Sequence, residues 1–118
     1  MNMMNFSKQI CIKMNSTKYS KQEQFAIVSI LIMIMEADGV IDPNEVKFLN
    51  GVLSSSNISE SELEIISSYD FNQCQKILSS LASHELANAK FIFTEMAKCD
   101  GHTDPRELEI INRIGHKE

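Results

Sequence analysis

Carboxylate side chains in two short turns are the residues of this chain best suited to chemistry. Residues 35–45 read Met-Glu-Ala-Asp-Gly-Val-Ile-Asp-Pro-Asn-Glu, and residues 97–107 repeat the pattern Asp-Gly-x-x-Asp-Pro-x-Glu. The matching positions are Asp38 and Asp100, Gly39 and Gly101, Asp42 and Asp104, Pro43 and Pro105, and Glu45 and Glu107. Hard cations such as Ca²⁺ and Mg²⁺ prefer clustered carboxylate oxygens of this kind. The acidic residues among these pairs are therefore candidate metal ligands.

The repeated residues also have a purely structural interpretation. A glycine ends a helix, an Asp before Pro caps the next helix, and a Glu three residues later completes a capping box. Asp38 and Asp100 fit this interpretation poorly, because an acid in the last turn of a helix opposes the helix dipole by about 0.3–1 kcal/mol. A nearby cation, or a bond across the turn to amides of the next helix, would offset that cost. The sequence leaves both interpretations open.

Neither turn is a complete EF-hand loop. With Gly39 at the sixth position, Glu45 falls at the twelfth, but the first position is Ile34, which cannot bind Ca²⁺. In the second turn, Met96 and Lys98 occupy the first and third positions. Strong Ca²⁺ binding by one loop is therefore not expected, whereas two adjacent turns could share one ion or hold two weakly.

Other catalytic or metal-binding patterns are also incomplete. The segment His84-Glu85-Leu86-Ala87-Asn88 begins like a zinc-protease helix but has Asn88 where the second histidine must stand. Cys99 and His102 supply only half of a structural zinc site, which needs four ligands. No glycine-rich phosphate loop or activated nucleophile is recognisable. We therefore expect a non-enzymatic protein.

Helices must position the two turns. The segment Ser20-Lys21-Gln22-Glu23 predicts a capping box, and residues 25–35 after it are apolar except for Ser29. No segment alternates as a strand would, so we expect an all-α, compact domain of six to seven helices. It would consist of two pseudo-repeated helix–turn–helix units, with the two long helices packed centrally. The expected helices cover residues 21–38, 43–53, 60–68, 71–82, 83–100 and 105–115.

Residues 1–20 are the part of the sequence that is hardest to interpret. Phe6, Ile10, Cys11 and Met14 would form one apolar stripe on a short helix, but the segment could equally be a tail. We therefore divide the chain into an N-terminal tail or short helix, residues 1–20, and a helical domain, residues 21–118.

Composition limits the location and the partners of the protein. The formal net charge of −5 argues against nucleic acid and anionic membranes as main partners. Three widely spaced cysteines suit reduced thiols, no signal peptide is visible, and no apolar run reaches the roughly 20 residues of a membrane span. We expect a cytoplasmic protein without membrane insertion, with a protein partner of unknown identity, and leave a homodimer open.

The segment from Ala37 through Glu45 resembles the signature of TerB-like domains, and residues 100–107 are similar to that family's second half. These domains are found in tellurite-resistance proteins and at the cytosolic end of certain membrane-anchored DnaJ-like co-chaperones. The resemblance covers residues 21–118 and implies a compact helical domain with an acidic surface, linked to stress response and metal-related defence through protein complexes. It also implies divalent-cation binding at Asp38, Asp42, Glu45, Asp100, Asp104 and Glu107. Lys98, His102 and Arg106 depart from the acidic pattern, so a symmetric two-ion site is not expected.

These observations predict a non-enzymatic helical module. Its acidic turns would bind a divalent cation weakly, with Ca²⁺ favoured over Mg²⁺ or Mn²⁺, or would present a charged face to a partner protein. The alternative is a structural or oligomerising domain whose repeated acids only cap helices. A metal-dependent hydrolase would need an open coordination position beside a general base, and the sequence indicates none.

Overall fold

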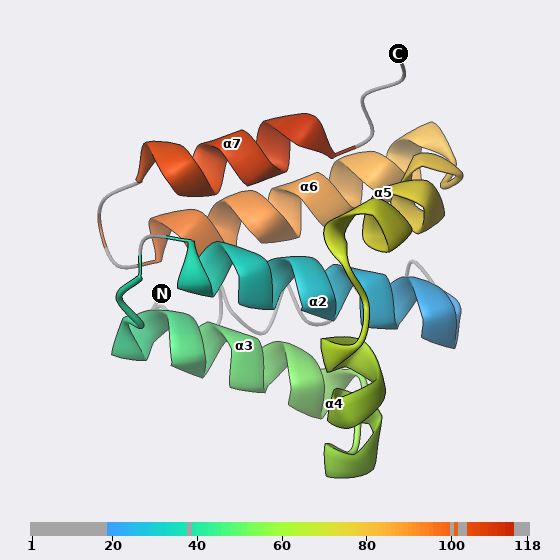
Figure 1. Ribbon diagram of the computed structural model, residues 1–118, viewed down its shortest axis with the longest axis horizontal. Coiled ribbons are helices and arrows are strands. Elements are labelled where there is room, and N and C mark those ends of the chain that lie inside the picture. The colour runs from blue at the N-terminus through green and yellow to red at the C-terminus, as the bar shows by residue number, and fades with distance from the viewer. Residues whose placement is uncertain (1–18, 38, 100, 102–103, 115–118) are drawn as a thin grey trace, which may run out of the picture.

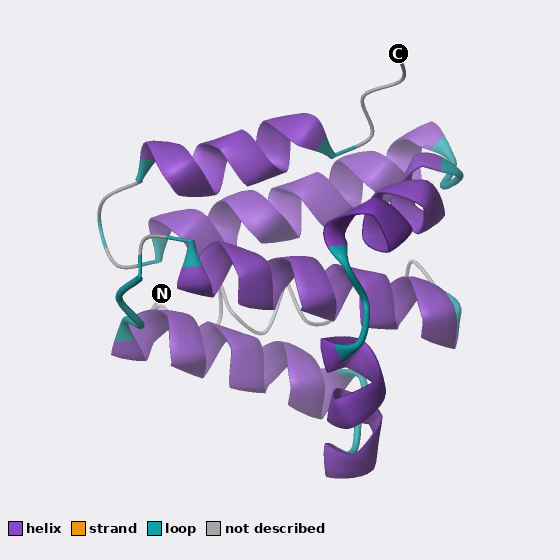
Figure 2. Ribbon diagram, in the orientation of Figure 1, coloured by secondary structure: helices purple, strands orange, loops and turns teal. Residues whose placement is uncertain are grey.

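Six α-helices and no strand make up the described part of the chain. The computed structural model describes residues 19–37, 39–99, 101 and 104–114, and Figures 1 and 2 show these helices joined by short loops. The expected all-α class is therefore confirmed. The helices are α2 (Lys21–Glu36), α3 (Pro43–Ser55), α4 (Glu60–Ser67), α5 (Phe71–Ser79), α6 (Ser83–Lys98) and α7 (Pro105–Arg113).

Helix α2 is the central element, because it packs against each of the other five. Its sequence explains this position. A helix that is apolar on all sides must be covered on several sides, and even its one interior polar residue, Ser29, is buried. Its amino end carries the expected capping box, in which Ser20 and Glu23 bond each other's backbone amides. None of the described helices has both the length and the apolar character needed to cross a membrane.

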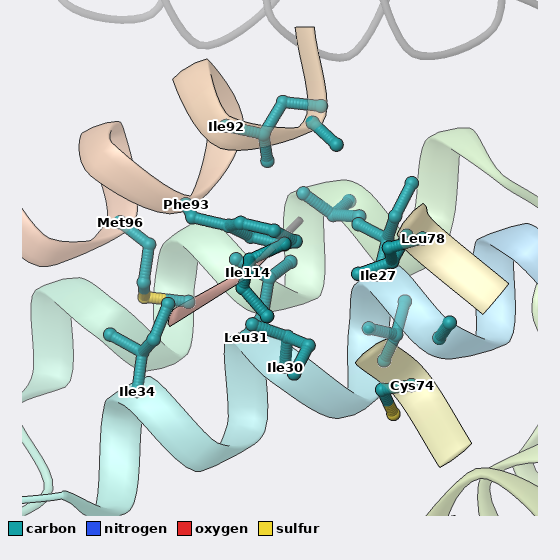
Figure 3. Packing of buried hydrophobic residues seen from close by; sticks show 14 of the residues in the cluster. Ile27, Ile30, Leu31, Ile34, Cys74, Leu78, Ile92, Phe93, Met96 and Ile114 are labelled. Carbon is teal, nitrogen blue, oxygen red and sulfur yellow. The ribbon is translucent and has the colours of Figure 1, made fainter. Parts of the chain in front are cut away.

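The core lies between α2 and α6, with α5 and the end of α7 closing it (Figure 3). Burying one large aliphatic or aromatic side chain contributes about 1.5–3 kcal/mol relative to leaving it exposed, so this cluster dominates the stability of the domain. Its labelled members are Ile27, Ile30, Leu31 and Ile34 from α2, Cys74 and Leu78 from α5, Ile92, Phe93 and Met96 from α6, and Ile114, and all are fully buried.

Several helix ends differ from those expected. Helices α2 and α6 end two residues earlier than expected, and α5 ends at Ser79 instead of Ala82. At that end the Ser80 hydroxyl donates to the Ile77 carbonyl at 2.7 Å, and the Leu81 amide bonds the Leu78 carbonyl at 3.1 Å. These bonds close the last turn. They also satisfy carbonyls that a longer helix would have used.

Tyr19 joins the start of α2 to α6. Its hydroxyl donates to the Glu85 carbonyl at 2.6 Å and accepts a hydrogen bond from the Asn88 side chain at 3.3 Å. The residue is 5% exposed. Residues 1–18 of the expected N-terminal segment lie outside the described residues.

Tyr19→Phe keeps the ring but removes both hydrogen bonds, so we expect it to lower the free energy of unfolding by about 0.5–1.5 kcal/mol. Burial raises the pKa of Tyr19 more than the Asn88 bond lowers it. The neutral phenol therefore stabilises the fold below a pH of about 10, and this contribution is lost as pH rises through the folded-state pKa. Urea unfolding at neutral and alkaline pH measures both effects, with Tyr69→Phe as the control. Equal alkaline sensitivity in Tyr19→Phe and the parent protein would contradict the prediction.

Candidate acidic site

Both acidic turns lie at the same end of the molecule. Helices α2 and α6 pack against each other and run in the same direction, so their carboxyl ends reach the same end of the bundle (Figure 1). Helices α3 and α7 begin there and run back. The fold therefore brings two segments that are far apart in the sequence to one end.

The two turns have the left-handed glycines and the aspartate caps that the sequence predicts. Gly39 and Gly101 have φ angles of +79° and +96°, in the left-handed region that favours glycine. Asp42 accepts a hydrogen bond from the Asn44 amide at 2.7 Å, and Asp104 caps α7 in the same way. Proline occupies the first helical position in both α3 and α7. The predicted glycine stops and aspartate caps are thus confirmed.

The two turns differ in the charge that stands beside the capping aspartate. The Asp104 carboxylate accepts two hydrogen bonds from the Arg106 guanidinium, from Nε to Oδ1 and from Nη2 to Oδ2, both at 3.1 Å. In the first turn, Asn44 stands at the position of Arg106 and carries no charge. Such a surface ion pair contributes little stability. It does, however, neutralise Asp104, so the first turn is the better candidate for a cation.

The most unusual feature of this end is a pair of buried glutamates. Glu45 is 1% exposed and Glu107 is 3% exposed, and the Oε2 atom of Glu45 is inaccessible to solvent. We expected both side chains to complete capping boxes. In the described part, both halves of a capping box are present at Ser20 with Glu23 and at Ser59 with Glu62. At α3 and α7 the glutamate is buried instead.

The helical spacing agrees with the burial of these carboxylates but does not establish it without the packing of the helices. Glu45 lies one turn before Leu49, and Glu107 lies one turn before Ile111, and both Leu49 and Ile111 are core residues. A charged group is costly to bury unless hydrogen bonds, an opposite charge or a metal stabilise it. The amino ends of α3 and α7 supply part of this stabilisation, because their dipoles favour a negative charge.

An exposed apolar pair that was not predicted from the sequence lies in the first turn. Val40 is 67% exposed and Ile41 is 55% exposed, the highest values among the large apolar side chains described. Neither helix capping nor cation binding requires an apolar surface at this place. The first turn thus presents exposed apolar side chains beside acidic ones.

The candidate ligand set is only partly within the described residues. Asp42, Glu45, Asp104 and Glu107 belong to it, whereas Asp38, Asp100 and the His102 of the zinc alternative lie outside. Among the residues that the structure describes, no three His, Cys, Asp or Glu side chains come together as a metal-binding group. Metal binding by the full set stays a prediction.

The two cysteines of the described region do not suggest chemistry. Cys74 is fully buried in the core, and burial raises the pKa of its thiol more than the bond to Ser29 lowers it. Cys99 is half-buried at the end of α6. A raised pKa keeps a thiol protonated and unreactive at neutral pH.

Replacing Gly39 or Gly101 by alanine tests what the left-handed backbone costs in stability when the residue is not glycine. Nothing lies within 4 Å of a Cβ placed at Gly39 or Gly101, so an alanine would meet no steric clash. The left-handed backbone alone should cost about 1–2 kcal/mol. Gly101→Ala should cost more than Gly39→Ala, because a φ of +96° is farther from the left-handed minimum near about +57°. Urea unfolding measures both, with Gly101→Asn expected to cost less. Alanine variants as stable as the parent protein would contradict the prediction.

Comparisons of the chain with protein-family models, with curated proteins and with solved structures returned no match. The TerB-like resemblance stays a prediction from the residues of the two turns.

Proposed function

We propose that the chain is a non-enzymatic helical module of the TerB-like type whose first acidic turn binds a divalent cation weakly. The observation that supports it best is the burial of Glu45 and Glu107 at equivalent positions after the two turns. A domain that needed only helix caps could leave these glutamates in solvent, as it does Glu60 and Glu64. A cation at this end would stabilise buried negative charge directly.

The proposal assigns the ion to the first turn. Glu36 is exposed at the end of α2, and the half-exposed Asp42 follows the turn. Asp38 lies between them in the sequence and completes a set of oxygen ligands with Glu45. Ca²⁺ suits this set because it accepts several oxygen ligands in flexible geometry. The second turn contributes less, because Arg106 neutralises Asp104.

Two further parts of the proposal come from the sequence. The first is that the two helix–turn–helix units are pseudo-repeats of one unit. The role in stress response or tellurite resistance follows only from the TerB-like resemblance.

A second candidate function is recognition of a partner protein through the same end. The exposed Val40 and Ile41 favour it, because apolar side chains beside acidic ones suit a protein contact. The remaining alternative is a structural or oligomerising domain in which Asp42 and Asp104 only cap helices.

Thermal unfolding of the metal-stripped protein with and without millimolar Ca²⁺, Mg²⁺, Mn²⁺ or Zn²⁺ tests the cation proposal. An ion at about 100 times its dissociation constant adds about 2.7 kcal/mol to the free energy of unfolding. That corresponds to a rise in Tm of several degrees, at roughly 4 °C per kcal/mol. We expect this rise with Ca²⁺.

The variant Asp38→Asn/Asp100→Asn should lose the rise in Tm while keeping the caps at Asp42 and Asp104. Glu60→Gln/Glu64→Gln is the matched control, because it removes the same charge from the exposed surface of α4. The control should respond to Ca²⁺ as the parent protein does. No rise with any ion, or equal rises in both variants, would exclude a cation site in the turns.

A further inference from the structure

We propose that residues 1–18 of this chain dock onto an exposed surface beside the first acidic turn. This surface, here called the turn surface, consists of Val40 and Ile41 with the acidic Glu36 and Asp42 on either side. The proposal does not depend on cation binding.

The turn surface combines apolar area with negative charge. Val40 and Ile41 are adjacent in sequence and are the two most exposed large apolar side chains described. Glu36 is exposed, and Asp42 uses one carboxylate oxygen, Oδ1, to cap α3. From residue 36 to residue 46 the sequence has acidic residues and no lysine or arginine. A segment that covers this surface should therefore be both apolar and basic.

Residues 1–18 have this composition. All 16 acidic residues of the chain follow residue 18, whereas three of its 11 basic residues, Lys8, Lys13 and Lys18, lie within the segment. Phe6, Ile10 and Met14 stand four residues apart, the spacing of one apolar face of a helix. The two parts of the chain therefore complement each other in charge and in apolar character.

The segment is long enough to reach the turn surface. It joins the domain at Tyr19, beside the amino end of α2, whereas the turn surface lies at the carboxyl end. The 16 residues of α2 separate the two ends by about 24 Å at about 1.5 Å per residue. Eighteen residues span up to about 60 Å when extended, at about 3.3 Å each. Part of the segment can thus cross this distance while the rest makes contact.

Other exposed apolar residues fit less well. Ile65 on α4, Phe91 on α6 and Leu108 on α7 each stand apart from the others in sequence and are less exposed than Val40 and Ile41. Lys90 lies next to Phe91, and Arg106 lies near Leu108. The glutamates around Ile65 give a comparable charge, so α4 is the natural control surface.

A spin label at Cys11 of the full chain tests the proposal by NMR in the absence of divalent cations. Cys99→Ser removes the half-buried cysteine, and Cys74 is fully buried and so protected from labelling. The label should broaden the amide signals of Val40 and Ile41 more than that of Ile65. High salt should weaken the broadening, because the Debye length falls from about 10 Å at 0.1 M to about 3 Å at 1 M. Lys8→Glu/Lys13→Glu should reduce the broadening in the same way.

The variant Val40→Ser/Ile41→Ser supplies the complementary result, since both residues are exposed and the fold should tolerate the change. It should lose the broadening and increase the rate of trypsin cleavage after Lys8 and Lys13. Broadening centred on Ile65 or Phe91, or no localised broadening, would overturn the proposal. Broadening that occurs only between a spin-labelled copy and a separate isotope-labelled copy would assign the surface to a second molecule and would also overturn it.

Discussion

Phe93→Ala should lower the free energy of unfolding by about 3–5 kcal/mol, the largest loss that we expect from one substitution. Phe93 is fully buried in α6 and belongs to the same core cluster as Leu31 of α2 and Ile114 after α7 (Figure 3). Alanine removes the whole ring and leaves a cavity between three elements. Because domains of this kind are stable by only about 5–15 kcal/mol, the variant should be close to unfolding at physiological temperature.

Phe91→Ala is the matched control for this prediction. It removes the same atoms two positions earlier in the same helix, where the side chain is 37% exposed. Urea unfolding should show less than half the loss of Phe93→Ala. Equal losses would mean that the core is not centred between α2 and α6, and a loss near zero for Phe93→Ala would contradict the packing in Figure 3.

Local signals explain why the helices could be predicted from the sequence. The capping boxes at Ser20 and Ser59, and the glycine stops after α2 and α6, depend on residues within one helical turn of each other. Such signals act before any tertiary contact forms. Where they are weak, as at the serine-rich end of α5, the predicted end was wrong by three residues.

The acidic end depends on long-range packing, so less of it could be predicted. The parallel course of α2 and α6 brings the two turns to one end, and no local motif encodes that course. The sequence identified Glu45 and Glu107 as polar residues of interest. It did not reveal their burial, because burial depends on how α3 and α7 are rotated against α2 and α6.

Glu45→Gln and Glu107→Gln should each lower the free energy of unfolding by about 1–3 kcal/mol. The amide keeps the shape of the side chain but loses the charge, so interactions that depend on this charge, including the favourable one with the helix dipole, are weakened. Glu64→Gln is the control, because this glutamate is exposed on α4 and should change stability by less than about 0.5 kcal/mol. A neutral result at both buried positions would mean that their carboxylates are not ionised in the fold.

The double variant Glu45→Gln/Glu107→Gln shows whether the two turns act as one site. Distant, independent sites add within about 0.3–0.5 kcal/mol, whereas residues of one network show a coupling energy of about 0.5–3 kcal/mol. Both glutamates lie in the first turn of helices that begin at the same end of the bundle, so we expect coupling. Repeating the measurements on the single and double variants with Ca²⁺ separates two causes of coupling. Coupling that grows when the ion is added would indicate a shared cation, whereas coupling that stays constant would indicate a hydrogen-bonded network within the protein. Strict additivity would show that each buried glutamate serves only its own turn, as the helix-capping alternative requires.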